Sequence, residues 1–327
     1  MEHIIKRKAE ALHCESIVLD THCDTLTAML DEGRPLAGCP GLGHLDLPRL
    51  RTGKINVQFF AAFIAPEFKS TAVRRVLELV DLFYREIESN NDVILHAKSM
   101  NDINKAITSG KIAAFLSVEG GEALAGSLGI LRVLYRLGVR SITLTWNGRN
   151  ELGAGAGEDC PGEGLTEFGI AVVREMNDLG LLVDVSHLSE QGFWDVLRTS
   201  RQPIIASHSN CRALCDHPRN LTDEQIKALA ERGGVIGVTF VPDFLGGENT
   251  SVDHVLAHIE HVIAVGGPDC VGLGSDFDGT ERLPLGLVDC SRLPVITMGL
   301  LERGYSENVI KKVLGGNFIR VMRQVIK

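Results

Sequence analysis

Short apolar runs recur along the whole chain, and segments with helical spacing lie between most of them. The runs are rich in β-branched and small apolar residues, which favours buried strands. Residues 71–89 instead repeat apolar positions at intervals of three and four, as an amphipathic helix does. The pattern predicts strands near residues 16–21, 55–63, 112–118, 140–145, 181–186, 203–207, 235–240 and 271–275.

The same helical spacing predicts the elements that separate the later strands. Thr222 and Gln225 have the spacing of a capping box, in which two side chains satisfy backbone N–H groups of the first helical turn. One helix is therefore expected to begin there. The predicted helices cover residues 167–179, 190–200, 222–232, 251–265 and about 306–325.

Alternation of strands and helices is typical of a parallel sheet. Eight such units in 327 residues fit a (β/α)8 TIM barrel better than an open doubly wound sheet, which usually has fewer strands. The expected fold class is therefore α/β, with residues 1–327 forming a single (β/α)8 barrel domain. The active site of such a barrel lies at the C-terminal ends of its strands.

Six residues suited to metal binding stand at or just past the ends of the apolar runs. Side chains alternate faces along a strand, so His22 and Asp24 point the same way and one strand end can offer two ligands. Imidazole together with carboxylate is the donor set expected for zinc or another first-row divalent ion. The six residues are His22, Asp24, Glu119, His187, His208 and Asp276.

Five of these residues can be divided between two metal ions. Two ions would hold a bridging water that becomes hydroxide near neutral pH, which suits hydrolysis of an amide, an ester or a phosphoester. A carboxylate has two oxygens and can therefore bridge the ions. In this assignment His22 and Asp24 bind one ion, His187 and His208 bind the other, and Glu119 lies between them.

Other polar positions suit substrate handling. Amide hydrolysis needs a proton donor for the departing nitrogen, for which Asp276 is the candidate and Asp278 a rival on the same face. Arg219, in a loop after the sixth predicted strand, is placed to bind a substrate carboxylate with its guanidinium. Residues 146–166 are rich in glycine and acidic residues and form either a solvated loop or a mobile loop over the pocket.

Composition narrows the class of protein. The net charge of −9 argues against a nucleic-acid or anionic-membrane partner, since both require a basic surface. No GxGxxG motif follows the first predicted strand and no GxxxxGK[ST] motif is present, so dinucleotide and P-loop sites lack support. The N-terminus has no signal-peptide core and the cysteines are few and irregularly spaced, so we expect a cytoplasmic protein with reduced thiols.

The motifs around these residues carry a family resemblance that runs nearly end to end. The chain resembles the membrane (renal) dipeptidase family, the M19 metallopeptidases, within the amidohydrolase-like barrels. The segments that carry the likeness are DTHCD (20–24), VEGGEAL (118–124), GVRSITLTWN (138–147), VDVSH (183–187), ASHSN (206–210), HPRN (217–220), GSDFDG (274–279) and GGNFIRV (315–321).

The resemblance implies a zinc-dependent dipeptidase with two Zn²⁺ ions, held by the five ligands assigned above with Glu119 bridging. It also implies that Arg219 binds the C-terminal carboxylate of the substrate and that Asp276 handles the proton delivered to the leaving amine. Family members cleave dipeptides, often with a D-residue at the C-terminal position, and some open β-lactam rings. They are often homodimers, so a homodimer is expected on the same basis.

One position departs from the family pattern. Where the mammalian enzymes have a histidine after the fourth strand, this chain has Trp146. The indole N–H can donate one hydrogen bond but can neither accept a proton nor bind metal, so polarisation of the substrate falls to the metal or to Asn147. The departure bears on the substrate range, β-lactams above all. The chain also lacks the hydrophobic tail of the lipid-anchored mammalian relatives, which suggests no membrane anchor.

Two other functions stay open from the residues alone. One is a different binuclear amidohydrolase that acts on a cyclic amide, a lactone or a phosphoester. Several of those enzymes bridge their metals with a modified lysine, whereas the bridging position here is Glu119. The other is a barrel that binds metal without catalysis, which the intact set of ligands disfavours.

Overall fold

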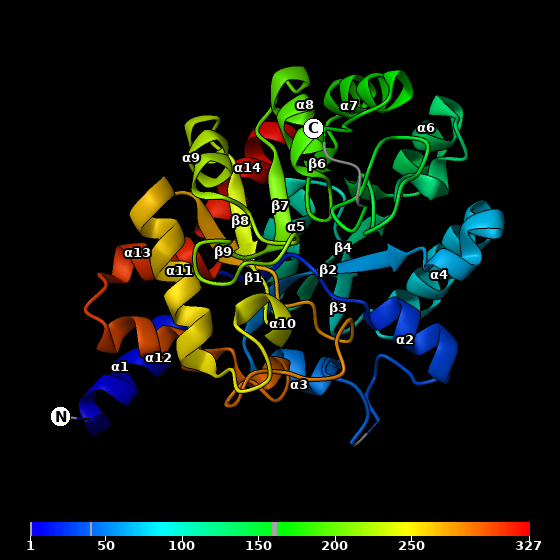
Figure 1. Ribbon diagram of the computed structural model, residues 1–327. Coiled ribbons are helices and arrows are strands. Elements are labelled where there is room, and N and C mark those ends of the chain that lie inside the picture. The colour runs from blue at the N-terminus through cyan, green and yellow to red at the C-terminus, as the bar shows by residue number, and fades with distance from the viewer. Residues whose placement is uncertain (1, 40, 159–161) are drawn as a thin grey trace.

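Eight parallel strands close into a barrel in the computed structural model, which describes residues 2–39, 41–158 and 162–327 (Figure 1). The ring is closed because β2 pairs with both β1 and β4. This arrangement confirms the predicted (β/α)8 barrel, and each predicted strand is present. In ring order the strands are β2 (Ile55–Phe63), β1 (Val18–Asp20), β9 (Val271–Leu273), β8 (Val235–Val238), β7 (Ile205–Ser209), β6 (Leu182–Asp184), β5 (Val139–Thr143) and β4 (Ile112–Glu119).

One strand that the pattern did not predict lies outside this ring. It is β3 (Ile94–His96), which pairs in parallel with the first three residues of β4, from Ile112 to Ala114. The pairing of β4 with β5 begins further along, at Leu116. A strand of three residues is too short to show an alternating pattern, so the sequence did not reveal it.

Alternate residues of β4 pack into two different hydrophobic clusters. Ala113 and Phe115 belong to a cluster inside the barrel, which also contains residues of β1, β2, β6, β7 and β8. Their neighbours Ala114 and Leu116 belong to the cluster between the barrel and its surrounding helices. This two-residue period places Glu119, at the end of β4, on the interior face.

The predicted helices are present close to their expected bounds. Helix α9 begins as expected, because Thr222 and Gln225 form the predicted capping box. Helix α4 buries a continuous apolar stripe that includes Val76, Leu79 and Phe83. These helices are α4 (Ala72–Ser89), α7 (Glu167–Leu179), α8 (Glu190–Thr199), α9 (Asp223–Glu231) and α11 (Val252–Gly266).

The prediction of one continuous helix over about 306–325 was wrong in its middle. The segment forms α13 (Glu307–Lys311), a π-helical turn η4 (Lys312–Gly316) and α14 (Asn317–Val325). Gly315 passes so close to β1 that an added Cβ would lie 2.5 Å from the carbonyl oxygen of Ile17. The chain is kinked there, and α14 then packs Phe318 and Met322 into the interior cluster.

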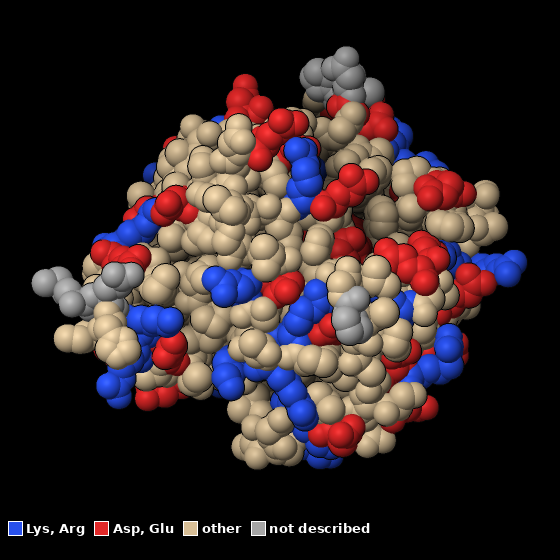
Figure 2. All heavy atoms as spheres, turned by 90° about the horizontal axis from the view of Figure 1, so that it is seen from below, with Lys and Arg blue, Asp and Glu red and all other residues tan. Residues whose placement is uncertain are grey.

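Further helices complete the outer layer (Figure 1). Among the residues that the structure describes, no helix is both long and apolar enough to cross a membrane. Lysine and arginine side chains are interspersed with aspartate and glutamate on the face shown in Figure 2. The remaining helical elements are α1 (Glu2–Glu15), α2 (Thr25–Glu32), α3 (Leu47–Thr52), η1 (Pro66–Thr71), α5 (Met100–Thr108), η2 (Gly121–Leu124), α6 (Leu128–Arg136), α10 (Pro242–Leu245), η3 (Cys290–Arg292) and α12 (Pro294–Glu302).

Candidate active site

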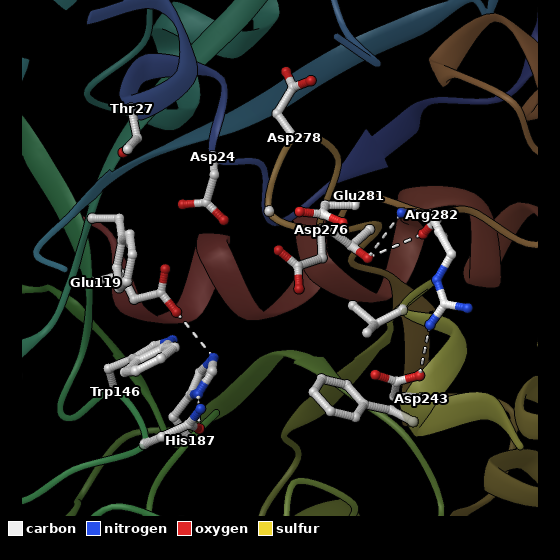
Figure 3. Close-up of a pocket in the computed structure, with 16 residues that line it drawn as sticks. Asp24, Thr27, Glu119, Trp146, His187, Asp243, Asp276, Asp278, Glu281 and Arg282 are labelled. Atoms are coloured by element: carbon white, nitrogen blue, oxygen red, sulfur yellow. Dashed lines mark hydrogen bonds and ion pairs between the residues drawn. The ribbon is translucent and has the colours of Figure 1, made fainter. Parts of the chain in front are cut away.

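A cavity of about 470 Å³ opens where the C-terminal ends of the strands meet (Figure 3). The carboxylates of Asp24, Glu119 and Asp276 point into it from three different strand ends. The sequence-predicted residues that line the cavity are Asp24, Glu119, Trp146, Asn147, His187, Asp276 and its rival Asp278. His22 and His208 are buried and contact this group of residues, as the following distances show.

Glu119 lies between two groups of imidazoles. Its Oε2 atom is 3.3 Å from Nε2 of His22. Its Oε1 atom is 3.0 Å from Nε2 of His187 and 3.6 Å from Nε2 of His208. One carboxylate oxygen thus faces the residues from the first strand, and the other faces the residues from β6 and β7. This is the arrangement required of a residue that bridges two ions.

The first group gathers around Nε2 of His22. This nitrogen lies 3.5 Å from Asp24 Oδ2 and 3.7 Å from Asp276 Oδ1. Within the part of the chain that the structure describes, neither His22 Nε2 nor Asp24 Oδ1 has a hydrogen-bond partner, although both atoms are buried. His22, Asp24 and Asp276 offer ligand atoms within 4.8 Å of one another, and so do His22, Glu119 and His208. Buried polar atoms without partners are costly, so these groups suit a bound cation.

The second group contains two imidazoles whose Nε2 atoms are 2.7 Å apart. The other ring nitrogen of His187 is 2.8 Å from Asn147 Oδ1, and that of His208 is 2.8 Å from Ser207 Oγ. If each Nδ1 donates its proton to these oxygens, both Nε2 atoms carry lone pairs that face each other. Two facing lone pairs repel unless a cation lies beside them. The donor set therefore fits a metal ion.

A β-bulge brings Ser207 and His208 to the same side of β7. Between Ala206 and Ser209, β7 advances three residues while its partner strand β8 advances two. A bulge of this kind changes the direction of a side chain, and bulges are frequent beside active sites. Without the extra residue, strict alternation would direct His208 away from the barrel interior.

Burial and charge together set the pKa values in this group. Burial favours the neutral acid of Glu119, but the imidazoles of His22 and His187 hold its pKa below the usual value. Burial alone would lower the pKa of His22, yet Glu119 and Asp24 raise it well above the usual range. Burial and then the charge of Arg219 lower the pKa of His187 to about 4. Glu119 is thus ionised and His187 neutral near pH 7, as metal ligands must be, whereas His22 would have to lose a proton when a metal ion binds.

Asp276 and Asp278 follow β9 on the same loop but differ in surroundings. Burial raises the pKa of Asp276 to about 8, and the charges of Asp24 and Glu119 add to the effect. Asp278 forms an ion pair with buried Arg34 at 2.7 Å and accepts further hydrogen bonds from Thr25 and from a backbone N–H. These contacts bind Asp278 to neighbouring segments, whereas Asp276 faces the ligand group.

Two site residues have backbones in the left-handed region. The φ angles are 65° at both His187 and Asp276. Histidine and aspartate occupy this region more often than most residues, although at some conformational cost. Both residues lie three positions beyond the end of a strand, and their side chains face the cavity (Figure 3).

Trp146 and Asn147 line the cavity from the loop after β5. The indole of Trp146 packs against Phe63 and His187, with ring centroids 5.6 and 6.0 Å apart. Asn147 contacts His187, as described above, so it orients a candidate ligand. The sequence offered no signal for this contact, because the two residues are 40 positions apart. Residues 159–161 of the same loop lie outside the described residues.

Arg219 is buried beside the site and does not line the cavity. Its Nη2 donates to the carbonyl of His208 at 2.8 Å, and its guanidinium lies 5.4 Å from the ring centroid of Phe244, which does line the cavity. Among the described residues no carboxylate lies within ion-pair distance of it, and its Nε has no partner. Burial lowers its pKa to about 10, so it remains charged at neutral pH.

The outer part of the cavity contains residues that the sequence analysis missed. Arg282, from the loop after β9, lies 3.5 Å from Asp243 of α10 and 3.4 Å from Glu248 (Figure 3). These exposed pairs join two loops at the cavity mouth. Phe63, Val241 and Phe244 add apolar wall. The candidate ligands were identified because each is a metal-binding group at the end of an apolar run. None of the residues in this outer part of the cavity has that combination.

Comparison with known proteins places this geometry in context. Residues 6–327 match the profile of a family described as membrane dipeptidase (peptidase family M19). A dipeptidase, verJ, from Clonostachys rogersoniana is 35% identical over 296 residues, which cover 87% of this chain and 76% of the relative.

Solved structures of similar proteins share the fold. The dipeptidase AC, a metallopeptidase of family M19, is 30% identical with a TM-score of 0.89, and the alignment covers 95% of this chain and 99% of the other. A metallopeptidase from Rhodobacter sphaeroides, liganded with a phosphinate mimic of L-Ala-D-Ala, is 29% identical with a TM-score of 0.88, covering 95% and 100%.

Proposed function

The chain belongs to the membrane dipeptidases of peptidase family M19 and is a metallodipeptidase, and from this premise we propose that it cleaves dipeptides at a binuclear zinc site. The observation that carries the proposal is the position of Glu119, whose two oxygens face different imidazole groups. In the same proposal, residues 1–327 act as one barrel domain.

The proposed ligands fall into two sets around Glu119. His22 and Asp24 would hold one ion, and His187 and His208 the other. Two zinc ions bound there would lower the pKa of a bound water toward neutrality and polarise the scissile carbonyl. The partnerless Nε2 of His22 and the close approach of the other two Nε2 atoms support this assignment.

Asp276 is the proposed proton carrier. The leaving amine of a dipeptide must gain a proton, and a buried carboxyl group at the cavity wall can hold one. Asp276 lines the cavity and its carboxylate faces His22, with a separation of 3.7 Å. Asp278 is less suited to this role, because Arg34 and Thr25 already occupy its oxygens.

Arg219 is the proposed binding group for the C-terminal carboxylate. A buried cation without a partner anion is unfavourable, so the site is suited to receive a negative charge from the substrate. Phe244 lines the cavity and its ring contacts this guanidinium, so we propose that the ring shifts when substrate binds. The relative that binds a mimic of L-Ala-D-Ala supports a D-residue at the C-terminal position.

Arg219→Met is expected to raise KM for free dipeptides roughly 10- to 100-fold, since a charge-assisted hydrogen bond contributes about 1.5–3 kcal/mol. The corresponding dipeptide amides should be cleaved by both forms with similar KM. Arg201→Met is the control, because Arg201 is exposed and pairs with Asp178 away from the cavity. Steady-state kinetics on both substrate types measure the effect. Equal losses on acids and amides would contradict the carboxylate role.

Metal analysis and a substrate screen test the proposal as a whole. We expect two zinc equivalents by elemental analysis and turnover of both L-Xaa-L-Xaa and L-Xaa-D-Xaa dipeptides. N-acetylated dipeptides, lactones and phosphotriesters serve as comparison substrates. Saturation at one equivalent would refute the binuclear site. Two equivalents with turnover of a lactone or phosphotriester, and none of any dipeptide, would refute the substrate assignment.

A further inference from the structure

A buried hydrogen-bonded chain connects His208 to a carboxylate beneath the site. Nδ1 of His208 is 2.8 Å from Ser207 Oγ, which in turn contacts Oδ2 of Asp184. The exposed fractions of the three residues are 0%, 2% and 1%. Leu182 and Ile205, two residues before Asp184 and Ser207, belong to the interior cluster. These three hydrogen-bonded side chains thus form a polar layer between the apolar interior and the proposed metal site.

The direction of each hydrogen bond follows from the surroundings of Asp184. Its Oδ1 accepts the backbone N–H groups of Ser186 and Ser207, at 3.0 and 2.9 Å. Its Oδ2 accepts the hydroxyl of Thr143 at 2.5 Å as well as that of Ser207. Four donors satisfy a carboxylate that has no hydrogen to give. The Ser207 hydroxyl therefore donates to Asp184, and its lone pair accepts the Nδ1–H of His208.

The hydrogen bonds from Asp184 through Ser207 determine the tautomer of His208. With the proton held on Nδ1, the Nε2 lone pair is directed at the space beside Glu119 Oε1, 3.6 Å away. His187 differs, because its Nδ1 contacts the neutral amide oxygen of Asn147. A carboxylate behind a ligating imidazole orients the ring and makes it a stronger base. His208 receives that effect through a serine hydroxyl.

The backbone of Ser207 is also held firmly. Its carbonyl oxygen accepts the hydroxyl of Thr21 at 2.6 Å, across the barrel interior. Gly237 and Gly274 approach the same oxygen so closely that an added Cβ would lie 2.1 and 1.8 Å from it. The backbone that carries the Ser207 hydroxyl is thus contacted by β8 and by the residues that directly follow β1 and β9.

We propose that Ser207 and Asp184 are positioning residues that act through His208 and raise its affinity for the metal ion. The inference rests on the proposed function, because it presumes that His208 binds metal. The proposed role explains why Asp184 is buried where the described residues offer its carboxylate hydrogen-bond donors but no ion-pair partner.

The test compares Ser207→Ala, Asp184→Asn and the double variant with the wild-type protein. Competition with a chromogenic chelator measures affinity for Zn²⁺, and the absorption spectrum of the Co²⁺-loaded protein reports the ligand field. We expect one of the two metal equivalents to bind about 10- to 100-fold more weakly in each single variant, as for other substitutions of residues that hydrogen-bond a metal ligand. Because Ser207→Ala already removes the hydrogen bonds between His208 and Asp184, adding Asp184→Asn in the double variant should weaken metal binding little further.

Ser141→Ala is the matched control. Ser141 is buried on β5, and among the described residues its hydroxyl makes a hydrogen bond only to the carbonyl of Leu182, at 3.5 Å. Its removal should leave metal affinity and the Co²⁺ spectrum unchanged. Circular dichroism checks that every variant is folded, and Asp184→Asn, which keeps the side-chain shape, provides a second variant if Ser207→Ala is unstable.

The outcomes separate the two proposals. If the wild-type protein binds two metal equivalents and the Ser207→Ala variant binds both of them as tightly, the positioning role is overturned but the proposed function is not. Equal weakening in Ser141→Ala, or fully additive losses in the double variant, would indicate a general structural effect and also overturn it. Wild-type protein that takes up no zinc or cobalt overturns the proposed function and this inference together.

Discussion

Glu119→Gln is expected to abolish dipeptide hydrolysis and to remove at least one metal equivalent. Glutamine keeps the size of the side chain but has one neutral oxygen instead of two charged ones, so it can serve only one of the two imidazole groups that Glu119 faces. Metal ions contribute several kcal/mol to the transition state, so a fall in kcat/KM of roughly 10³-fold or more is expected. Elemental analysis and steady-state kinetics measure both effects.

Glu122→Gln is the control for this change. Glu122 follows Glu119 on the same chain segment and is partly buried, but its carboxylate contacts Asn150 and does not line the cavity. The Glu122→Gln protein should retain both metal equivalents and most of the dipeptidase activity. A Glu119→Gln protein that keeps two equivalents and more than a tenth of its activity would show that Glu119 does not bridge.

Asp276→Asn is expected to lower kcat about 10²- to 10⁴-fold, the usual contribution of a positioned acid or base. Asparagine cannot carry the proton that the leaving amine needs. The metal content should stay at the wild-type value, and the limb of the pH profile that reports this carboxyl should disappear. The pKa of about 8 applies without metal, and cations bound beside Asp276 would lower it.

Asp278→Asn distinguishes this role from a structural one. It removes the charge that pairs with buried Arg34, so we expect a lower melting temperature with the shape of the pH profile preserved. If Asp276→Asn loses metal in proportion to activity, Asp276 is a ligand rather than a proton carrier. Its proximity to His22 and Asp24 makes this comparison necessary.

Much of the fold could be read from the pattern of apolar residues. Strands of a parallel barrel are buried on both faces, so they appear as short apolar runs, and each run of the ring was visible. The candidate ligands could be found for the same reason, because a histidine or acid at the end of such a run interrupts it. The three-residue strand β3 and the kink at Gly315 were missed, since neither changes the local pattern enough to be noticed.

The contacts that orient the candidate ligands could not be predicted. Asn147 and His187 are 40 residues apart, and Ser207 and Asp184 are 23 apart. Their pairing depends on the order of strands around the ring and on the bulge in β7. The contact of Arg219 with Phe244 of α10 depends in the same way on two segments that only the folded barrel brings together.

The sequence by itself determined the barrel, the identity of the six residues at its strand ends and the resemblance to the metallodipeptidases, because each depends on local patterns of side chains. The tertiary structure decided how those residues are arranged relative to one another. It placed the oxygens of Glu119 between two imidazole groups, tied Asp278 to Arg34 while Asp276 faces the cavity, and put a serine and a carboxylate behind His208. These distinctions arise from ring closure and strand register, which bring distant residues within a few ångströms of one another.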